Sequence, residues 1–317
     1  MFNFAKFGNE LYTGERSYDI VGKRKIWYTI ALVLIVLSVA MPFLRGVNLG
    51  IEFRGGSEFR VSQVQELNTD LAVAAVATVN ADTVVRVSTI GGSTIRVQTD
   101  QLNDVETVQV SEALRNTYKV GEEDVTASYV GPSWGADVTG DALRGLLVFI
   151  LLASIVMALY FRTWKMSLAA ISAMLHDLIV TAGIFVLIGV EITPAAVIGF
   201  LTILGYSLYD TVVVFDKIRE NTLVMDSSRS FPSVVNLAVN QTLVRSINTS
   251  VVAVLPVGSI LFIGTALLGA STLRDIALSL FIGIIVGTYS TIFIAAPFYA
   301  HLREGEPQFA QKTAVKA

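Results

Sequence analysis

Long apolar stretches alternate with short polar segments along most of the chain. Six stretches are long enough to cross a membrane, since a bilayer core of about 30 Å needs roughly 20 apolar residues in a helix. They cover residues 26–44, 143–161, 166–190, 194–215, 247–268 and 276–299. The pattern therefore predicts an α-helical integral membrane protein with six transmembrane helices.

One polar segment is long enough to fold by itself. We divide the chain into an N-terminal segment (1–25), helix 1 (26–46), an outside domain (47–140), helices 2–6 (141–300) and a tail (301–317). Within 47–140, alternating apolar residues predict strands at 57–61, 85–90, 95–98 and 125–129, and helical spacing predicts helices at 67–79 and 105–114. Gly91 and Gly92 suit a two-residue type I′ hairpin. The order β-α-β-β-α-β predicts a ferredoxin-like α+β domain.

Basic residues predict the orientation of the helices, because they accumulate in cytoplasmic loops. Fourteen of the 23 lysines and arginines fall on one side: Lys6, Arg16, Lys23, Arg24, Lys25, Arg162, Lys165, Lys217, Arg219, Arg229, Arg245, Arg303, Lys312 and Lys316. The short loops on the opposite side are nearly free of them, with Arg274 as the exception. Both termini are therefore predicted to be cytoplasmic and the domain at 47–140 extracytoplasmic.

Composition supports a membrane protein and narrows its chemistry. Hydrophobic residues make up 53% of the chain and charged residues 15%, against about 25% charged in a soluble domain. The mean hydropathy is +0.63. A net charge of −3 gives no reason to expect a nucleic-acid partner, and there are no cysteines for thiol chemistry. No metal or cofactor is expected. The N-terminal run is polar, so the first span is expected to be retained.

Asp210 is the leading candidate functional residue. An ionised side chain at the centre of a bilayer costs at least about 2.5–3.5 kcal/mol, so each one suggests a function. Thr202, Tyr206 and Asp210 recur every four residues and share one helix face. A desolvated carboxyl group that is neutral until water or a cation reaches it could carry protons. The alternative is a fixed hydrogen bond or ion pair between two helices.

Two further groups of polar residues lie in the predicted spans. Arg245 is a candidate counter-charge for Asp210 and belongs to a stripe with Gln241, Asn248 and Thr249. Alternatively, its side chain extends to the cytoplasmic headgroups. His176 and Asp177 are adjacent and point about 100° apart on a helix, which favours interhelical hydrogen bonds over a shared metal site.

Several motifs now resemble those of the SecF family, a relative of the proton-driven RND transporters. Residues 50–56 (Gly-Ile-Glu-Phe-Arg-Gly-Gly) are similar to the glycine-rich motif after the first helix, with Glu52 in place of the usual aspartate. The His176-Asp177 pair matches a family dipeptide. Residues 205–221 are similar to the fourth-helix signature, with Tyr209 where many members have asparagine, and 240–250 resemble the approach to the fifth helix.

The resemblance covers nearly the whole chain and implies an accessory, non-enzymatic subunit of the bacterial plasma membrane. With SecD, such a subunit assists passage of unfolded polypeptides through the SecYEG channel by using the proton gradient. The resemblance also implies that Asp210 and Arg245 take part in proton conduction. An RND-type exporter of lipids or small molecules is the main alternative, although such proteins usually repeat the six-helix unit. An intramembrane enzyme would need paired catalytic groups that the sequence lacks, and a passive scaffold would tolerate loss of Asp210.

Overall fold

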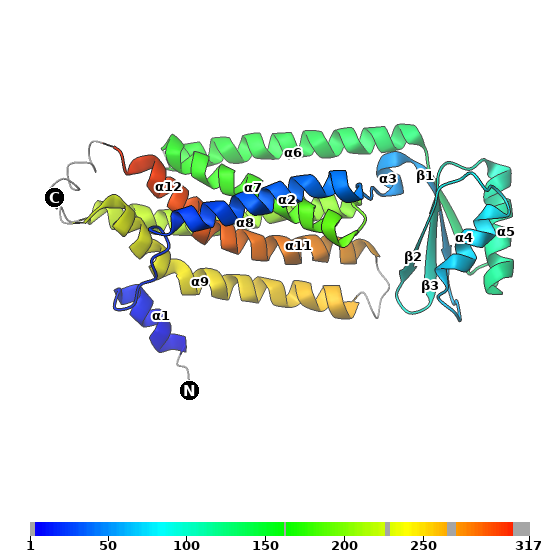
Figure 1. Ribbon diagram of the computed structural model, residues 1–317, viewed down its shortest axis with the longest axis horizontal. Coiled ribbons are helices and arrows are strands. Elements are labelled where there is room, and N and C mark those ends of the chain that lie inside the picture. The colour runs from blue at the N-terminus through cyan, green and yellow to red at the C-terminus, as the bar shows by residue number, and fades with distance from the viewer. Residues whose placement is uncertain (1–3, 162, 226–228, 265–270, 307–317) are drawn as a thin grey trace.

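The computed structural model describes residues 4–161, 163–225, 229–264 and 271–306. A bundle of long helices carries a small sheet with two helices at one end, whereas the helices at residues 4–13 and 296–303 lie at the other end (Figure 1). Arg162, Lys312 and Lys316, the end of the fifth apolar stretch and the final residues of the tail lie outside the described residues.

The bundle contains six helical segments that are long and apolar enough to span a membrane, as the hydropathy pattern predicts. They are α2 (Arg24–Arg45), α6 (Pro132–Phe161), α7 (Trp164–Ile188), α8 (Pro194–Leu223), α9 (Phe231–Ser259) with the π-helix η1 (Ile260–Gly264), and α11 (Ser271–Ser290) with the π-helix η2 (Thr291–Ala295) and α12 (Ala296–Arg303). The chain is therefore a multi-pass membrane protein.

Three of these helices form the centre of the bundle. About half of the most apolar part of α7, α8 and α11 is buried, compared with about a tenth or less of α2, α6 and α9. Small residues allow the close packing: a Cβ on Gly199 of α8 would collide with Ser279 of α11. The central position of α8 places Ser207, Asp210 and Thr211 away from the surrounding bilayer.

The helices extend further than the apolar stretches. Helix α6 begins at Pro132, and α9 begins at Phe231, sixteen residues before the predicted start at residue 247. The N-terminal segment also contains a helix, α1 (Phe4–Thr13), which the sequence analysis missed and whose Leu11 is fully buried. Hydropathy detects only the part of a helix that faces apolar surroundings, so polar extensions escape it.

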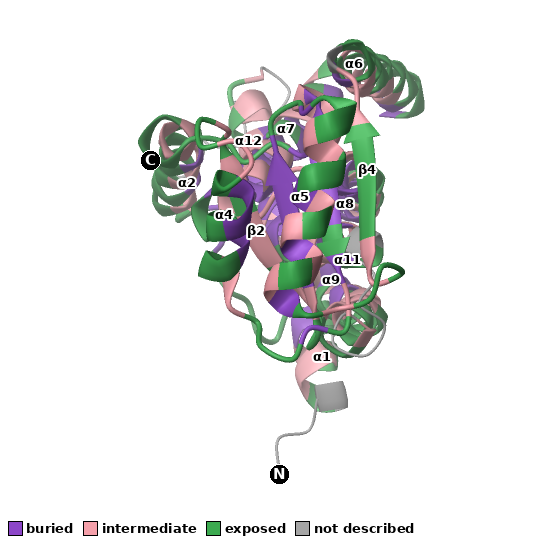
Figure 2. Cartoon of the chain, turned by 90° about the vertical axis from the view of Figure 1, so that its right-hand side faces the viewer, coloured by how far each residue is buried: buried purple, intermediate pink, exposed green. Residues whose placement is uncertain are grey.

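The domain between α2 and α6 contains the predicted sequence of strands and helices. Its elements are β1 (Gly56–Val61), α4 (Thr69–Ala77), β2 (Val85–Ile90), β3 (Thr94–Thr99), α5 (Asp104–Tyr118) and β4 (Val125–Val130). The strands form one antiparallel sheet in the order β2-β3-β1-β4. Phe59, Val61, Ile95 and Val97 pack on the side of α4 and α5, and the opposite, polar side of the sheet faces the bundle (Figure 2).

The hairpin between β2 and β3 differs from the prediction. Ile90 pairs with Thr94, which leaves the three residues 91–93 in the loop. A type I′ turn needs positive φ at both central positions, but only Gly91 has it, at +62°. The two-glycine type I′ prediction is therefore wrong, because the ladder closes one residue later than the glycine pair suggests.

A turn of two glycines joins the short helix α3 (Ile51–Arg54) to β1. Gly55 and Gly56 have φ angles of +77° and +139°, which residues with a Cβ rarely adopt. A Cβ on Gly56 would also collide with the backbone oxygen of Thr99. The start of α6 packs equally closely, because a Cβ on Gly135 would lie 2.6 Å from the Phe53 oxygen. These contacts fix the sheet relative to α6.

Candidate functional site

Asp210 lies near the middle of α8, in the interior of the bundle, and is 4% exposed. Its Oδ1 accepts a hydrogen bond of 2.9 Å from Ser246 Oγ on α9. Its Oδ2 is buried and has no hydrogen-bond partner among the described residues. The carboxyl group is therefore only half satisfied, and Oδ2 is free to hold a proton.

Hydroxyl groups continue from Asp210 towards the end of the bundle that carries the sheet. One turn along α8, the Tyr206 hydroxyl lies 3.4 Å from Ser250 Oγ on α9. Ser250 Oγ in turn lies 2.5 Å from Thr288 Oγ1 on α11. These groups join α8, α9 and α11 in one polar layer beside Asp210, inside an otherwise apolar bundle.

A second carboxyl group, on α7, is fully hydrogen-bonded. Asp177 Oδ2 accepts bonds from Ser207 Oγ on α8 (2.5 Å) and Ser290 Oγ on α11 (2.8 Å). Its Oδ1 lies 3.1 Å from His176 Nδ1. Ser207 and Asp210 are three residues apart on α8, so Asp177 contacts α8 about one helical turn away from Asp210. Asp177 thus links α7, α8 and α11.

The His176 ring uses only its Nδ1 in the contact with Asp177. Its Nε2 is buried without a partner among the described residues, as is the hydroxyl oxygen of Tyr289, whose ring centre lies 6.3 Å from that of His176. Within the described residues, no three His, Asp or Glu side chains are grouped to hold a metal ion.

Arg245 does not form an ion pair with Asp210 within the described part of the chain. Its side chain is exposed on α9, although it is close enough to interact electrostatically with the Asp210 carboxyl group. Asn248 is also exposed, and Thr249 hydrogen-bonds the Arg245 carbonyl oxygen. Arg245 and Asn248 therefore lie on the exposed side of α9, whereas Gln241 of the same predicted stripe accepts a hydrogen bond of 2.8 Å from Asn221 Nδ2 on α8.

Ser246 and Ser250 are the α9 residues that face Asp210 and its polar layer. The sequence analysis missed both, because small hydroxyl side chains do not stand out in an apolar helix. Their spacing of four residues, matching that of Tyr206 and Asp210, was the available signal.

The sheet meets the bundle at a charged junction. Arg96 of β3 forms an ion pair with Glu191 of the α7–α8 loop, with Nη2 and Oε2 2.6 Å apart. The same loop pairs with the segment after α2: Gly50 N donates to Ile192 O (3.0 Å), and Ile192 N to Asn48 O (2.7 Å). These bonds attach the loop to both the sheet and the glycine-rich turn.

Two carboxyl groups crowd this junction. A Cβ on Gly50 would lie within 4 Å of both Glu52 Oε2 and Glu191 Oε1, and both oxygens lack hydrogen-bond partners among the described residues. Burial raises the pKa of Glu52, and the negative charges of Glu191 and Glu58 raise it further. Glu52 therefore retains its proton to a higher pH than an exposed glutamate does.

The junction continues into the helices through the start of α8. Thr193 caps α8 by accepting a bond from the backbone nitrogen of Ala196, and its hydroxyl donates to Asp275 Oδ2 on α11 over 2.7 Å. The loop that binds the sheet thus leads directly into the helix that carries Asp210.

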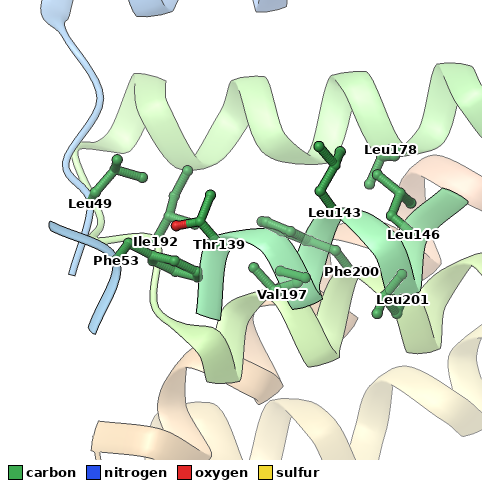
Figure 3. Close-up of a pocket in the computed structure, with 11 residues that line it drawn as sticks. Leu49, Phe53, Thr139, Leu143, Leu146, Leu178, Ile192, Val197, Phe200 and Leu201 are labelled. Atoms are coloured by element: carbon green, nitrogen blue, oxygen red, sulfur yellow. The ribbon is translucent and has the colours of Figure 1, made fainter. Parts of the chain in front are cut away.

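An apolar pocket of about 280 Å³ lies beside the junction (Figure 3). Leu143 and Leu146 of α6, Phe200 of α8 and Phe53 of α3 line it, and Thr139 is its only polar lining residue among those described. The Thr139 hydroxyl donates a hydrogen bond of 2.8 Å to Gly135 O, within its own helix.

Comparison with known families places the chain among protein-export components. The sequence model described as "Protein export membrane protein SecD/SecF, C-terminal" matches residues 109–305. A second model, "SecD/SecF GG Motif", matches residues 41–62, which include the glycine turn.

Similar proteins cover the chain almost completely. Protein translocase subunit SecF of Streptomyces coelicolor is 42% identical over 315 residues, which are 97% of this chain and 83% of that protein. SecF of Mycobacterium tuberculosis H37Rv is 38% identical, over 94% of this chain and 70% of that protein. The crystal structure of SecDF, a translocon-associated membrane protein from Thermus thermophilus, matches with a TM-score of 0.80 and 28% identity. That match covers 91% of this chain but only 39% of the SecDF chain.

Proposed function

Because the chain belongs to the SecD/SecF family of protein-export membrane proteins, we propose that it is an accessory subunit of the Sec translocase that couples the proton gradient to polypeptide export. One observation carries the coupling role: the half-satisfied carboxyl group of Asp210, buried in the middle of α8. Its role in this proposal is to bind and release protons, not to catalyse a reaction.

Protonation changes what Asp210 can do in its place. An ionised aspartate at the centre of a spanning helix costs about 2.5–3.5 kcal/mol on insertion scales. A proton on the free Oδ2 removes that charge and turns an acceptor into a donor. Asp210 would therefore favour one helix arrangement when protonated and another when ionised, with Tyr206, Ser246 and Ser250 as its alternative partners. In this proposal the charge of Arg245 promotes proton release.

The bundle supplies a path from this carboxyl group to the sheet. Helix α8 begins at Pro194, directly after Thr193, whose hydroxyl donates a hydrogen bond to α11. The loop that precedes α8 forms the ion pair with Arg96 of the sheet. A shift of α8 would therefore move the loop and the sheet together. One elementary charge crossing 100 mV releases about 2.3 kcal/mol, so a few protons could drive such a movement.

The proposed setting is the bacterial plasma membrane with both termini in the cytoplasm. The distribution of basic residues supports this orientation. In it, 47–140 forms an extracytoplasmic domain, and the strand order β2-β3-β1-β4 supports a ferredoxin-like fold for that domain. Its location at the bundle end opposite α1 and α12 is consistent with this (Figure 1).

The proposed partners are a SecD-type subunit, the SecYEG channel, exported unfolded polypeptides and the surrounding lipid. The chain spans 39% of the SecDF chain, which leaves room for a second helical unit. In the described chain Arg245 is exposed on α9, and so is Tyr209 beside Asp210. A charged residue on the outside of a spanning helix supports a protein partner on that face.

The test is gradient-dependent secretion of a reporter in cells whose own copy is replaced by Asp210→Asn. The amide keeps the shape and can still accept from Ser246, but it cannot release a proton. We expect secretion to be lost while the variant remains in the membrane at normal abundance. Asp216→Asn is the matched control, since Asp216 lies on the same helix and hydrogen-bonds the Tyr160 hydroxyl at an exposed site. Normal secretion by Asp210→Asn would overturn the proton role, and loss of the protein itself would support a structural role.

A further inference from the structure

Strand β2 has a free edge. It lies at one end of the strand order β2-β3-β1-β4 and pairs with β3 through residues 85–90. Within the described residues, no strand pairs with its other side. Such an edge presents a row of backbone N–H and C=O groups that a further extended chain can bind.

A cleft of about 720 Å³ runs along this edge. Four consecutive residues of β2, from Arg86 to Thr89, line it. Successive strand side chains point to opposite faces of a sheet, so this cleft reaches the free edge of β2, and Arg96 and Gln98 of β3 extend it over the polar face of the sheet. Residues 188–191 and the first turns of α11 form the opposite wall. The cleft thus lies between the sheet and the membrane helices.

The charged residues that line this cleft are three arginines and two carboxyl groups. Arg86, Arg96 and Arg274 face two carboxyl groups, Glu191 and Asp275. Arg96 is paired with Glu191 and Asp275 accepts from Thr193, whereas Arg86 and Arg274 are exposed and enter no ion pair among the described residues. Arg274 is also the basic residue that departs from the charge distribution of the short loops. An acidic side chain would complement this end of the cleft.

The opposite edge of the sheet lacks these features. In β4, residues 126–129 are exposed, and none of them lines the cleft beside β2. An extended chain bound there would gain backbone pairing but neither a second wall nor the arginines. The two edges therefore differ in a way that an experiment can measure.

We propose that the cleft along β2 binds an extended segment of the exported polypeptide, which adds to the sheet as a further strand. Backbone pairing explains how one site could accept many sequences, because every extended chain offers the same donors and acceptors. Six residues of β2 span about 20 Å, enough for a segment of similar length. This inference rests on the proposed function, since it assigns the surface that contacts the exported chain.

A binding measurement tests the pairing directly. The probe is a synthetic ten-residue peptide of alternating Thr, Val and Asp, applied to the full chain in lipid nanodiscs and followed by fluorescence anisotropy. We expect the affinity of the same peptide with alternate amides N-methylated to be lower by a factor of about ten or more, because this peptide cannot complete the ladder of backbone hydrogen bonds. Arg86→Ala with Arg274→Ala should weaken binding of this acidic peptide but not of a version with Asp replaced by Ser. Equal binding of methylated and unmethylated peptides would overturn the proposal.

Crosslinking in cells separates this proposal from the proposed function. A photoreactive amino acid at Thr89, on β2, is compared with one at Thr126, on β4; both positions are exposed. With a reporter arrested during export, we expect crosslinks from position 89 and few from 126. If secretion depends on this chain but position 89 gives no crosslink, or positions 89 and 126 crosslink equally, the β2 site is overturned and the proposed function is not. Secretion that does not depend on the chain would overturn the proposed function and the β2 site with it.

Discussion

Arg96 on the sheet and Glu191 in the α7–α8 loop form an ion pair, with the guanidinium nitrogen 2.6 Å from the carboxylate oxygen. Both side chains are largely buried, at 17% and 13% exposed, so bulk water screens the pair only in part. This pair directly connects the sheet to the loop that precedes α8. We therefore expect it to hold the sheet against the membrane helices.

Breaking this pair should loosen the junction. Arg96→Ala leaves Glu191 buried beside Glu52, so we expect a loss of about 1–3 kcal/mol in the coupling between sheet and loop. Faster hydrogen exchange in residues 47–56 would report it. The exchanged pair Arg96→Glu with Glu191→Arg should recover part of the protection, whereas either reversal alone should not. No rescue by the double variant would contradict a direct electrostatic link.

Glu52 should make stability depend on pH. Burial raises its pKa, so the folded chain binds this proton more tightly than the unfolded chain. The free energy of unfolding should therefore rise as the pH falls from above the folded pKa towards the ordinary value of 4.5. Comparing unfolding temperatures at about pH 5 and about pH 8, we expect Glu52→Gln to reduce the difference. Glu66→Gln, at an exposed site, is the control, and an unchanged difference in Glu52→Gln would disprove the assignment.

Single-cysteine labelling tests the orientation of the chain in the membrane. Because the sequence contains no cysteine, the introduced one is the sole labelling site on this chain. Asn116→Cys on α5 and Val224→Cys after α8 are both exposed in the structure. A membrane-impermeant maleimide should label position 116 in intact cells and position 224 only after the membrane is opened. The reverse pattern would exclude the proposed topology and, with it, the proposed function.

The sequence predicted the spans better than the site, for a physical reason. Hydropathy identifies helices that must face lipid, and it found six. It could not tell which face of α9 points inward, because Arg245 looks more functional than Ser246 in a linear sequence. Only the packing shows that Ser246 reaches Asp210 over 2.9 Å while Arg245 is exposed. The same limit hid α1, whose polar sequence folds because its Leu11 packs in the interior.

The exposed face around Arg245 should contact a SecD-type partner. A photoreactive residue at Val213, or at the neighbouring and more exposed Tyr209, should trap a second family subunit in native membranes. Recovery of the monomer or a self-dimer alone would contradict this pairing.

Arg245→Lys keeps the charge but loses the planar guanidinium, so it should impair secretion less than Arg245→Ala. Equal loss in both variants would indicate that the geometry of the guanidinium matters more than its charge.

Substitution by asparagine should reduce stability at Asp177 much more than at Asp210. Asp177 accepts hydroxyl bonds from Ser207 and Ser290 on two neighbouring helices, whereas Asp210 has one such bond and a free oxygen. If the amide introduced by Asp177→Asn turns its NH₂ towards these serines, they lose an acceptor, and each buried polar group left unpaired costs about 1–3 kcal/mol. If the amide turns its oxygen towards them, the NH₂ takes the place of Oδ1 beside His176. Either way, Asp177→Asn disturbs a satisfied network.

We therefore expect Asp177→Asn to lower the unfolding temperature in detergent and the amount of protein in the membrane. Asp210→Asn should leave both nearly unchanged, because Ser246 can still donate to the amide oxygen and the NH₂ occupies a position that had no partner among the described residues. Ser207→Ala, which removes one donor to Asp177, should weaken stability in the same direction as Asp177→Asn but less. If Asp210→Asn proves the more destabilising of the two, Asp210 is a structural clamp between helices, and the proposal that it binds and releases protons is wrong. If Asp177→Asn is stable but inactive, Asp177 belongs to the proton pathway and its hydrogen bonds must rearrange during the cycle.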